Sequence, residues 1–71
     1  MDTANLNHPT PTDAKMRSRV VFHNGRTHEL GTLTYWPGSQ SSRPPTVVGD
    51  NGRRHYPDPS RVWLAPTTEH P

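Results

Sequence analysis

Hydrophobic and polar residues alternate over several short stretches in the middle of the chain. Successive side chains of a β-strand point to opposite faces, so alternation over about four to eight residues predicts strands with one buried face. No stretch shows the spacing of a convincing amphipathic helix, and β-branched and aromatic residues gather in the alternating stretches. The predicted strands are Ser18–His23, Glu29–Trp36, Thr46–Gly49, Arg53–Tyr56 and Arg61–Ala65.

The large apolar side chains of these strands fall on a consistent parity, which predicts a shared core. If Val62 and Leu64 point into this core, Trp63 points outwards. We expect Trp63 either to cover one end of the fold or pack on Trp36, or to belong to a binding surface. The predicted core consists of Val20, Phe22, Leu33, Tyr35, Val47, Val62 and Leu64.

Residues that break regular structure separate the predicted strands. Asn24–Arg26 suits a turn, and Asp50–Gly52 predicts a tight hairpin with a two-residue turn that needs positive φ. Pro37–Pro45 predicts a flexible loop, and Pro57–Ser60 suits one turn of 3₁₀ helix. Gly31, inside the second strand, indicates a bulge or a sharp bend.

The length of 71 residues allows one domain at most, and only 27% of the residues are hydrophobic. The sequence contains no cysteine, which excludes disulfides and thiolate zinc sites as supports for a small core. Residues 1–16 and 66–71 are poor in side chains to bury, so we expect disordered tails around a domain at 17–65. With no apolar run near ~18 residues and no signal-peptide pattern, we expect a cytoplasmic protein that does not enter the membrane.

The order of strands, loop, hairpin and 3₁₀ turn resembles the Src-homology-3-like small β-barrel over residues 18–65. The residues that carry this resemblance are GTLTYW (31–36), VVGDNGRRHYP (47–57) and PDPSRVWL (57–64). The resemblance implies an all-β fold, namely a small five-stranded barrel with a 3₁₀ turn before the last strand.

Positive charge is concentrated in the predicted domain. The whole chain carries +2, but residues 15–65 hold eight cations against three acids, a net charge of +5. Seven of these cations are arginines, which suit phosphate and carboxylate recognition as well as stacking on rings. The alternative to recognition is that these cations form a solvated surface with no specific partner.

Catalytic and metal chemistry find little support in the sequence. His23, His28 and His55 form no metal-ligand motif, and Asp50 and Asp58 fit turn positions as local hydrogen-bond acceptors. No phosphate-binding glycine loop or nucleophile elbow is present. We therefore expect no metal, no cofactor and no enzymatic activity.

The layout of GTLTYW and HYPDPSRVWL is also similar to that of the plasmid-borne type II dihydrofolate reductases, which are small barrels active as tetramers. That family places a Val-Gln-Ile-Tyr run in its central pore. The matching run here is Arg53-Arg54-His55-Tyr56, so only the tyrosine and the proline after it agree. Two arginines would repel one another around a tetramer axis, which argues against this activity.

Two binding hypotheses follow, and both leave a homo-oligomer open. The first is a nucleic-acid-associated module, in which arginines contact phosphates and exposed aromatic rings stack on bases. The second is a protein-binding adaptor or inhibitor, of the kind that phages and plasmids encode, which captures a larger host protein through an exposed tryptophan or a sheet edge. The candidate binding residues are Arg53, Arg54, Tyr56, Arg61, Trp63 and Trp36.

Overall fold

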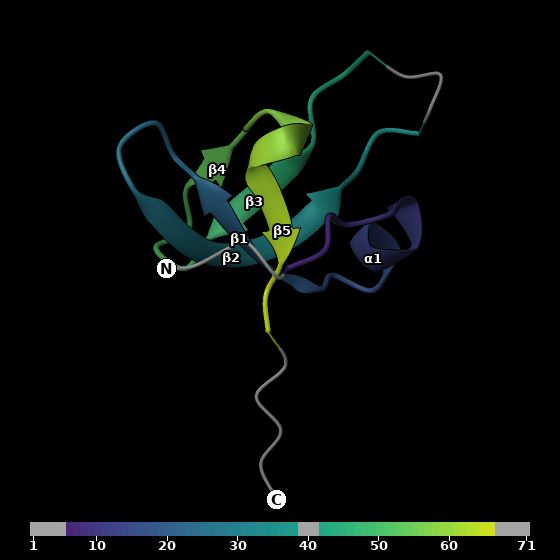
Figure 1. Ribbon diagram of the computed structural model, residues 1–71, viewed down its shortest axis with the longest axis horizontal. Coiled ribbons are helices and arrows are strands. Elements are labelled where there is room, and N and C mark those ends of the chain that lie inside the picture. Colours follow the sequence, from purple (N-terminus) through teal and green to yellow (C-terminus); the bar gives the residue numbers. More distant parts are fainter. Residues whose placement is uncertain (1–5, 39–41, 67–71) are drawn as a thin grey trace, which may run out of the picture.

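A single antiparallel sheet of five strands organises the chain (Figure 1). The computed structural model describes residues 6–38 and 42–66, and within them the strands lie in the order β4-β3-β2-β1-β5. The predicted strand-rich class and the predicted 3₁₀ turn before the last strand are confirmed, and one short α-helix is added. The elements are α1 (Pro11–Lys15), β1 (Arg19–His23), β2 (His28–Tyr35), β3 (Thr46–Gly49), β4 (Arg54–His55), η1 (Pro59–Arg61) and β5 (Val62–Leu64).

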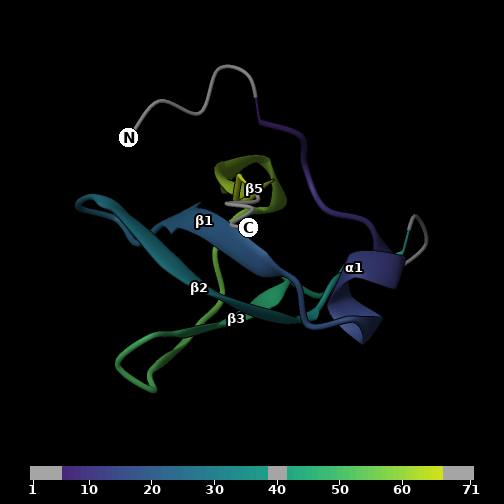
Figure 2. The ribbon, with the colours of Figure 1, turned by 90° about the horizontal axis from the view of Figure 1, so that it is seen from below.

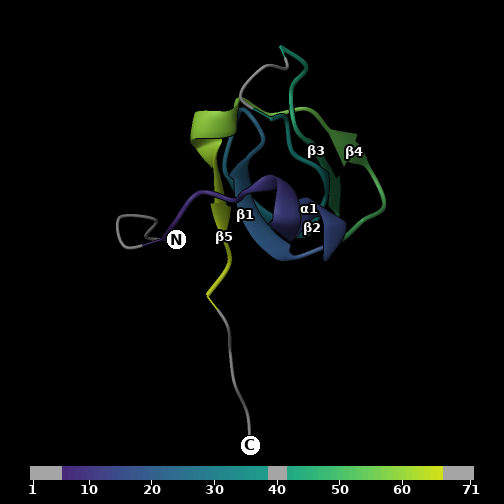
Figure 3. The ribbon, with the colours of Figure 1, turned by 90° about the vertical axis from the view of Figure 1, so that its right-hand side faces the viewer.

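The sheet curls around its inner face (Figure 3). The ring of His55 on β4 lies 4.7 Å from the ring of Phe22 on β1, although two strands separate β4 from β1 in the sheet. Gly31 permits close approach of the strands in between, because a Cβ atom there would lie 2.7 Å from the carbonyl oxygen of Val48. The register irregularity expected at Gly31 lies further along β2, between Leu33 and Tyr35.

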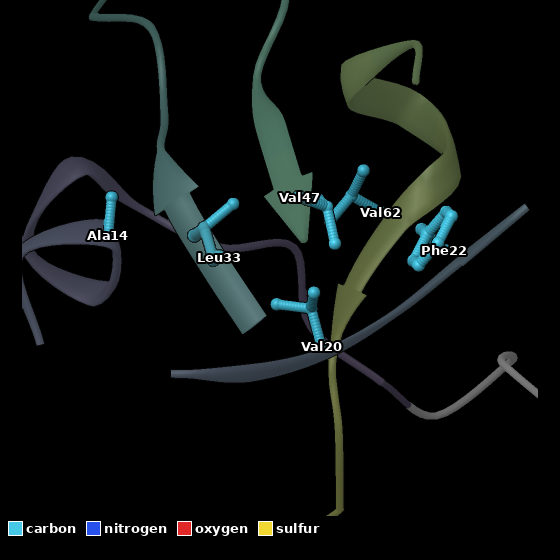
Figure 4. Close-up of a cluster of buried hydrophobic side chains, with 6 residues drawn as sticks. All are labelled: Ala14, Val20, Phe22, Leu33, Val47 and Val62. Atoms are coloured by element: carbon cyan, nitrogen blue, oxygen red, sulfur yellow. The ribbon is translucent and has the colours of Figure 1, made fainter. Parts of the chain in front are cut away.

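The core lies on the concave face and matches the predicted parity closely (Figure 4). Five predicted members are fully buried: Val20, Phe22, Leu33, Val47 and Val62. Leu64 is only partly buried and packs against this cluster, and Tyr35 is also partly buried. The guanidinium of Arg43 lies 5.6 Å from the centre of the Tyr35 ring, which gives that ring a cation–π partner.

The segment before β1 departs from the prediction. We expected no helix and a disordered tail over residues 1–16, but Pro11–Lys15 form α1, and Ala14 joins the core cluster. The backbone N–H and hydroxyl of Thr10 both donate to the Asp13 carboxylate, at 2.8 and 3.0 Å, which caps the helix start. The expectation is wrong for residues 6–16, while residues 1–5 and 67–71 lie outside the described part.

Residues 6–10, which we call the N-terminal strap, run beside β5 on their way to α1 (Figure 2). The backbone N–H of Leu64 donates to the carbonyl oxygen of Asn7 at 2.7 Å, on the side of β5 that faces away from β1. The ring of His8 stacks on Trp63 with centroids 5.8 Å apart. The strap thus covers the outer edge of β5. No helix in the described ranges is long and apolar enough to cross a membrane.

The β3–β4 hairpin has a three-residue loop, where a two-residue turn was predicted. The N–H of Gly52 donates to the carbonyl of Gly49, and the N–H of Gly49 donates to the carbonyl of Arg53. Gly52 has φ of +86°, so the predicted positive φ is confirmed at this residue. A turn followed by a left-handed glycine is the usual three-residue hairpin connection.

Candidate functional site

An open hollow of about 440 Å³ lies beside Tyr56, between the turn after β1 and the segment that links β4 to η1. Pro57 cannot donate to a neighbouring strand, so β4 ends at His55 and the chain turns away from the sheet. The Asp58 carboxylate then accepts from the N–H and the hydroxyl of Ser60, at 2.9 and 2.7 Å, and starts η1. This turn brings Arg61 to the hollow that Tyr56 also lines.

Tyr56 and its neighbour His55 face different surroundings. Tyr56 is 61% exposed, an unusual position for a large aromatic side chain in a fold with so few of them. His55 packs on Phe22, and its Nε2 atom is buried without a hydrogen-bond partner among the described residues. The exposed ring of Tyr56 therefore remains available for a ligand.

Trp63 lines a second hollow with His23, Ser60 and Arg61. Trp63 points away from the core, as predicted, and is partly buried rather than fully exposed. The rings of His8 and His28 lie 5.8 and 5.5 Å from it. Trp36 packs against the core cluster instead and lines neither hollow.

The predicted arginines are all exposed, but they do not all meet at one place. Arg61 lines both hollows, together with Tyr56 in one and Trp63 in the other. Arg53 and Arg54 lie just before Tyr56 in the chain, with Arg54 opposite Val48 in the β3–β4 pair, and they line neither hollow. Within residues 6–38 and 42–66, the one ion pair joins Arg19 to Asp50, so neither Arg53 nor Arg54 is neutralised by a described carboxylate.

Two carboxylates near these surfaces have structural partners. Hydrogen bonds from Ser60 hold the pKa of Asp58 below its ordinary value, which confirms its predicted role as a local acceptor. Asp50 was predicted to be a local acceptor in its turn, but its carboxylate binds Arg19 at 2.7 and 2.9 Å instead. This contact lowers the pKa of Asp50. The turn N–H of Arg53 donates to the side chain of Asn51. Asp58 is thus occupied by a contact within its own turn, and Asp50 by a contact that joins the β3–β4 loop to β1.

His23 is a residue of both hollows that the sequence did not single out for binding. Its Nδ1 atom accepts from the N–H of Gly25 at 3.1 Å, so the neutral ring carries its proton on Nε2. The only sequence signal was its place at the end of a strand, because the segments that meet it are more than thirty residues away. No group of three or more metal-ligating side chains gathers within the described residues.

The hollows bring together an exposed tyrosine, an arginine that forms no ion pair within residues 6–38 and 42–66, and a histidine with a defined donor. This set can bind an anion beside an aromatic ring. No protein-family model, curated protein or solved structure matches this chain.

Proposed function

We propose that the chain is a non-catalytic, nucleic-acid-associated binding module. The observation that carries this proposal is Tyr56, a residue that is 61% exposed and lines a hollow together with Arg61. Exposed aromatic rings beside arginines suit nucleic acid, because every base offers a π-face and every nucleotide a phosphate. Arg53 and Arg54 precede Tyr56 in the chain and are both exposed, so they supply two further cations for phosphate contacts.

The curled sheet supports a finer fold assignment as well. We infer that it is a small barrel of the Src-homology-3-like kind, opened between its edge strands β4 and β5. The support is the sheet order, the contact of His55 with Phe22 across the curl, and the 3₁₀ turn directly before β5.

The test is a titration of labelled oligonucleotides at low and physiological salt, with the wild type and the double variant Arg53→Ala/Arg54→Ala. Each phosphate contact contributes about 0.7–0.9 to the slope of log K against log salt. If both arginines contact phosphates, the double variant binds more weakly and its slope falls by about 1.4–1.8. The control is Lys15→Ala/Arg26→Ala, which removes the same charge from α1 and from the β1–β2 turn.

The outcomes separate the alternatives. A folded Arg53→Ala/Arg54→Ala protein that binds as the wild type does, or no more weakly than the control, contradicts the role of these two arginines. Absence of binding to any oligonucleotide at low salt contradicts the nucleic-acid role.

The protein-binding adaptor is the second candidate, and the sheet edge favours it. β4 is the end strand of the sheet and only two residues long, so its outer edge has no strand partner among the described residues. Peptides can add to such an edge as a further strand. A protein that retains a protein partner after loss of Arg53 and Arg54, but binds no nucleic acid, is the result that this candidate predicts.

A further inference from the structure

On the basis of the nucleic-acid role above, we propose that the two hollows form one site for single-stranded nucleic acid. In this site, one unpaired base stacks on Tyr56, and the neighbouring phosphate binds between His23 and Arg61.

The two hollows share part of their walls. His23 and Arg61 line both, whereas Tyr56 belongs to one and Trp63 to the other. The shared pair therefore lies where the two hollows meet, with an aromatic side chain on each side. In a nucleic-acid strand, each phosphate has a nucleotide base on either side. A phosphate bound by His23 and Arg61 would therefore place one of these bases beside Tyr56.

The shared pair offers hydrogen-bond donors. Gly25 occupies Nδ1 of His23, so Nε2 is the nitrogen that donates. Arg61 contributes a planar fork of N–H groups that fits phosphate oxygens. Asp58 is the carboxylate in the wall, and its Oδ1 atom accepts two hydrogen bonds from Ser60. Its charge also attracts Arg61, so a bound phosphate shares this arginine with Asp58 and takes its remaining hydrogen bond from His23.

The aromatic side chains differ in what they can still bind. His8 stacks on Trp63 with an interplanar angle of 28°, and His28 lies against it at 57°. Tyr56 has no ring partner of this kind among the described residues and is 61% exposed. The base therefore belongs on Tyr56, while Trp63 serves as a nearby optical reporter.

An unpaired strand fits these hollows better than a duplex. Bases inside a duplex are covered on both faces by their neighbours, so a protein ring stacks on a base only where the strand is single. The exposed side chain of Tyr56 therefore favours an unpaired base over a base inside a duplex.

The experiment measures fluorescence anisotropy with oligodeoxythymidylate, oligouridylate and a mixed-sequence duplex, each of about 12 nucleotides, which lies within the site sizes of small single-strand binders. We expect both single strands to bind at least tenfold more tightly than the duplex at physiological salt. Tyr56→Leu weakens single-strand binding roughly 5- to 150-fold, the usual range for stacking on one base, and leaves duplex binding unchanged. Tyr56→Phe is the matched control and keeps the wild-type affinity.

A second readout uses the intrinsic fluorescence of Trp63 in a Trp36→Phe background. Single strands should change this emission in proportion to the anisotropy, whereas Arg61→Gln should weaken both signals together. Equal affinities for single strand and duplex, or a folded Tyr56→Leu protein with unchanged single-strand binding, overturn the single-strand site and leave the wider nucleic-acid role standing. Failure to bind any of the three probes at low salt overturns both.

Discussion

The Nδ1 atom of His8 lies 2.7 Å from the carbonyl oxygen of Val62, although 54 residues separate them in the chain. A carbonyl oxygen only accepts, so His8 donates to it. With Asn7 accepting from the N–H of Leu64, the strap satisfies one acceptor and one donor on the outer edge of β5. Unpaired groups on an edge strand are a template for association between chains, and here the chain covers them itself.

Replacement of His8 tests the contribution of this edge contact. His8→Ala removes both the hydrogen bond to Val62 and the stacking on Trp63, so we expect the free energy of unfolding to fall by about 1–2 kcal/mol. Urea unfolding followed by tryptophan fluorescence measures the change. His8→Phe keeps an aromatic ring without the donor and should lose only part of this stability. Equal stability of His8→Ala and the wild type would mean that the strap does not hold β5.

Gly52 tests the backbone conformation of the hairpin. No atom lies within 4 Å of a Cβ added there, so a substitution acts only through the φ of +86°. An L-residue in this conformation costs about 1–2 kcal/mol, and a β-branched residue costs more. We expect Gly52→Ala to lower the melting temperature and Gly52→Val to lower it further. Gly38→Ala is the control, because Gly38 also has open space around it and does not require positive φ.

Gly31 tests the close approach of β2 to β3. A methyl group at Gly31 would lie 2.8 Å from Cγ1 of Val47 and closer still to the Val48 carbonyl, which belongs to the backbone and cannot move aside alone. We expect Gly31→Ala to destabilise the fold by about 1–3 kcal/mol, the usual cost of overpacking. At Gly49 the nearest atom is a side-chain oxygen of Asn51 at 3.1 Å, so Gly49→Ala should cost less. Similar unfolding midpoints for the two variants would contradict the crowding at Gly31.

Acid should weaken the fold through two aspartates. The pKa of Asp50 is lowered mainly by its hydrogen bond from Arg19, and that of Asp58 mainly by Ser60. A carboxyl group with a lowered folded-state pKa stabilises the fold fully above its ordinary value of 3.8, and this contribution is lost as pH falls through the folded-state pKa. We therefore expect the free energy of unfolding to decline from about pH 4 downwards.

The double variant Asp50→Asn/Asp58→Asn isolates this effect. It should be less stable than the wild type at pH 6 and should lose less further stability between pH 4 and pH 2. Parallel stability curves for the two proteins over that range would show that other groups are responsible. Both residues are exposed, so added salt should reduce the contribution of the Arg19–Asp50 pair.

Local pattern was enough to predict the sheet. Val20, Phe22, Leu33, Val47 and Val62 alternate with polar residues, and that periodicity follows from the geometry of a strand whatever its partner. Gly52 was likewise predictable, because its backbone conformation depends on its neighbours in the chain.

The helix α1 was missed because five residues are too few to display a helical period. A usable signal was nevertheless present, since Thr10 followed by Pro11 and then Asp13 is a helix start. The alternating pattern does not explain Val21, which is fully buried on the face opposite to the core cluster. Val21 lies opposite Leu30 on β2 and Trp63 on β5, and the ring of His8 stacks on Trp63. These neighbours are distant in the sequence, so local pattern could not predict the burial of Val21.

The candidate site depended still more on tertiary structure. Tyr56 and Arg61 could be selected from the sequence because they are close in the chain and chemically suited to a nucleic acid. His23 reaches the same hollow only through the curl of the sheet, and the stacking that covers Trp63 requires the strap. Arg53 and Arg54 do not line the hollow because of where β4 lies and ends. That position depends on the pairing of β4 with β3 as well as on Pro57.

The hydrogen bond between Asn7 and Leu64 also indicates that this fold tolerates a circular permutation. It places Asn7 beside Leu64, so a linker that joins the segment after β5 to the strap would cross a short gap. New ends could then open within residues 37–44, between β2 and β3. Such a circular permutant would keep every strand pair of the sheet while making the strap an internal segment, so the order of elements along the chain would change and their arrangement in space would not.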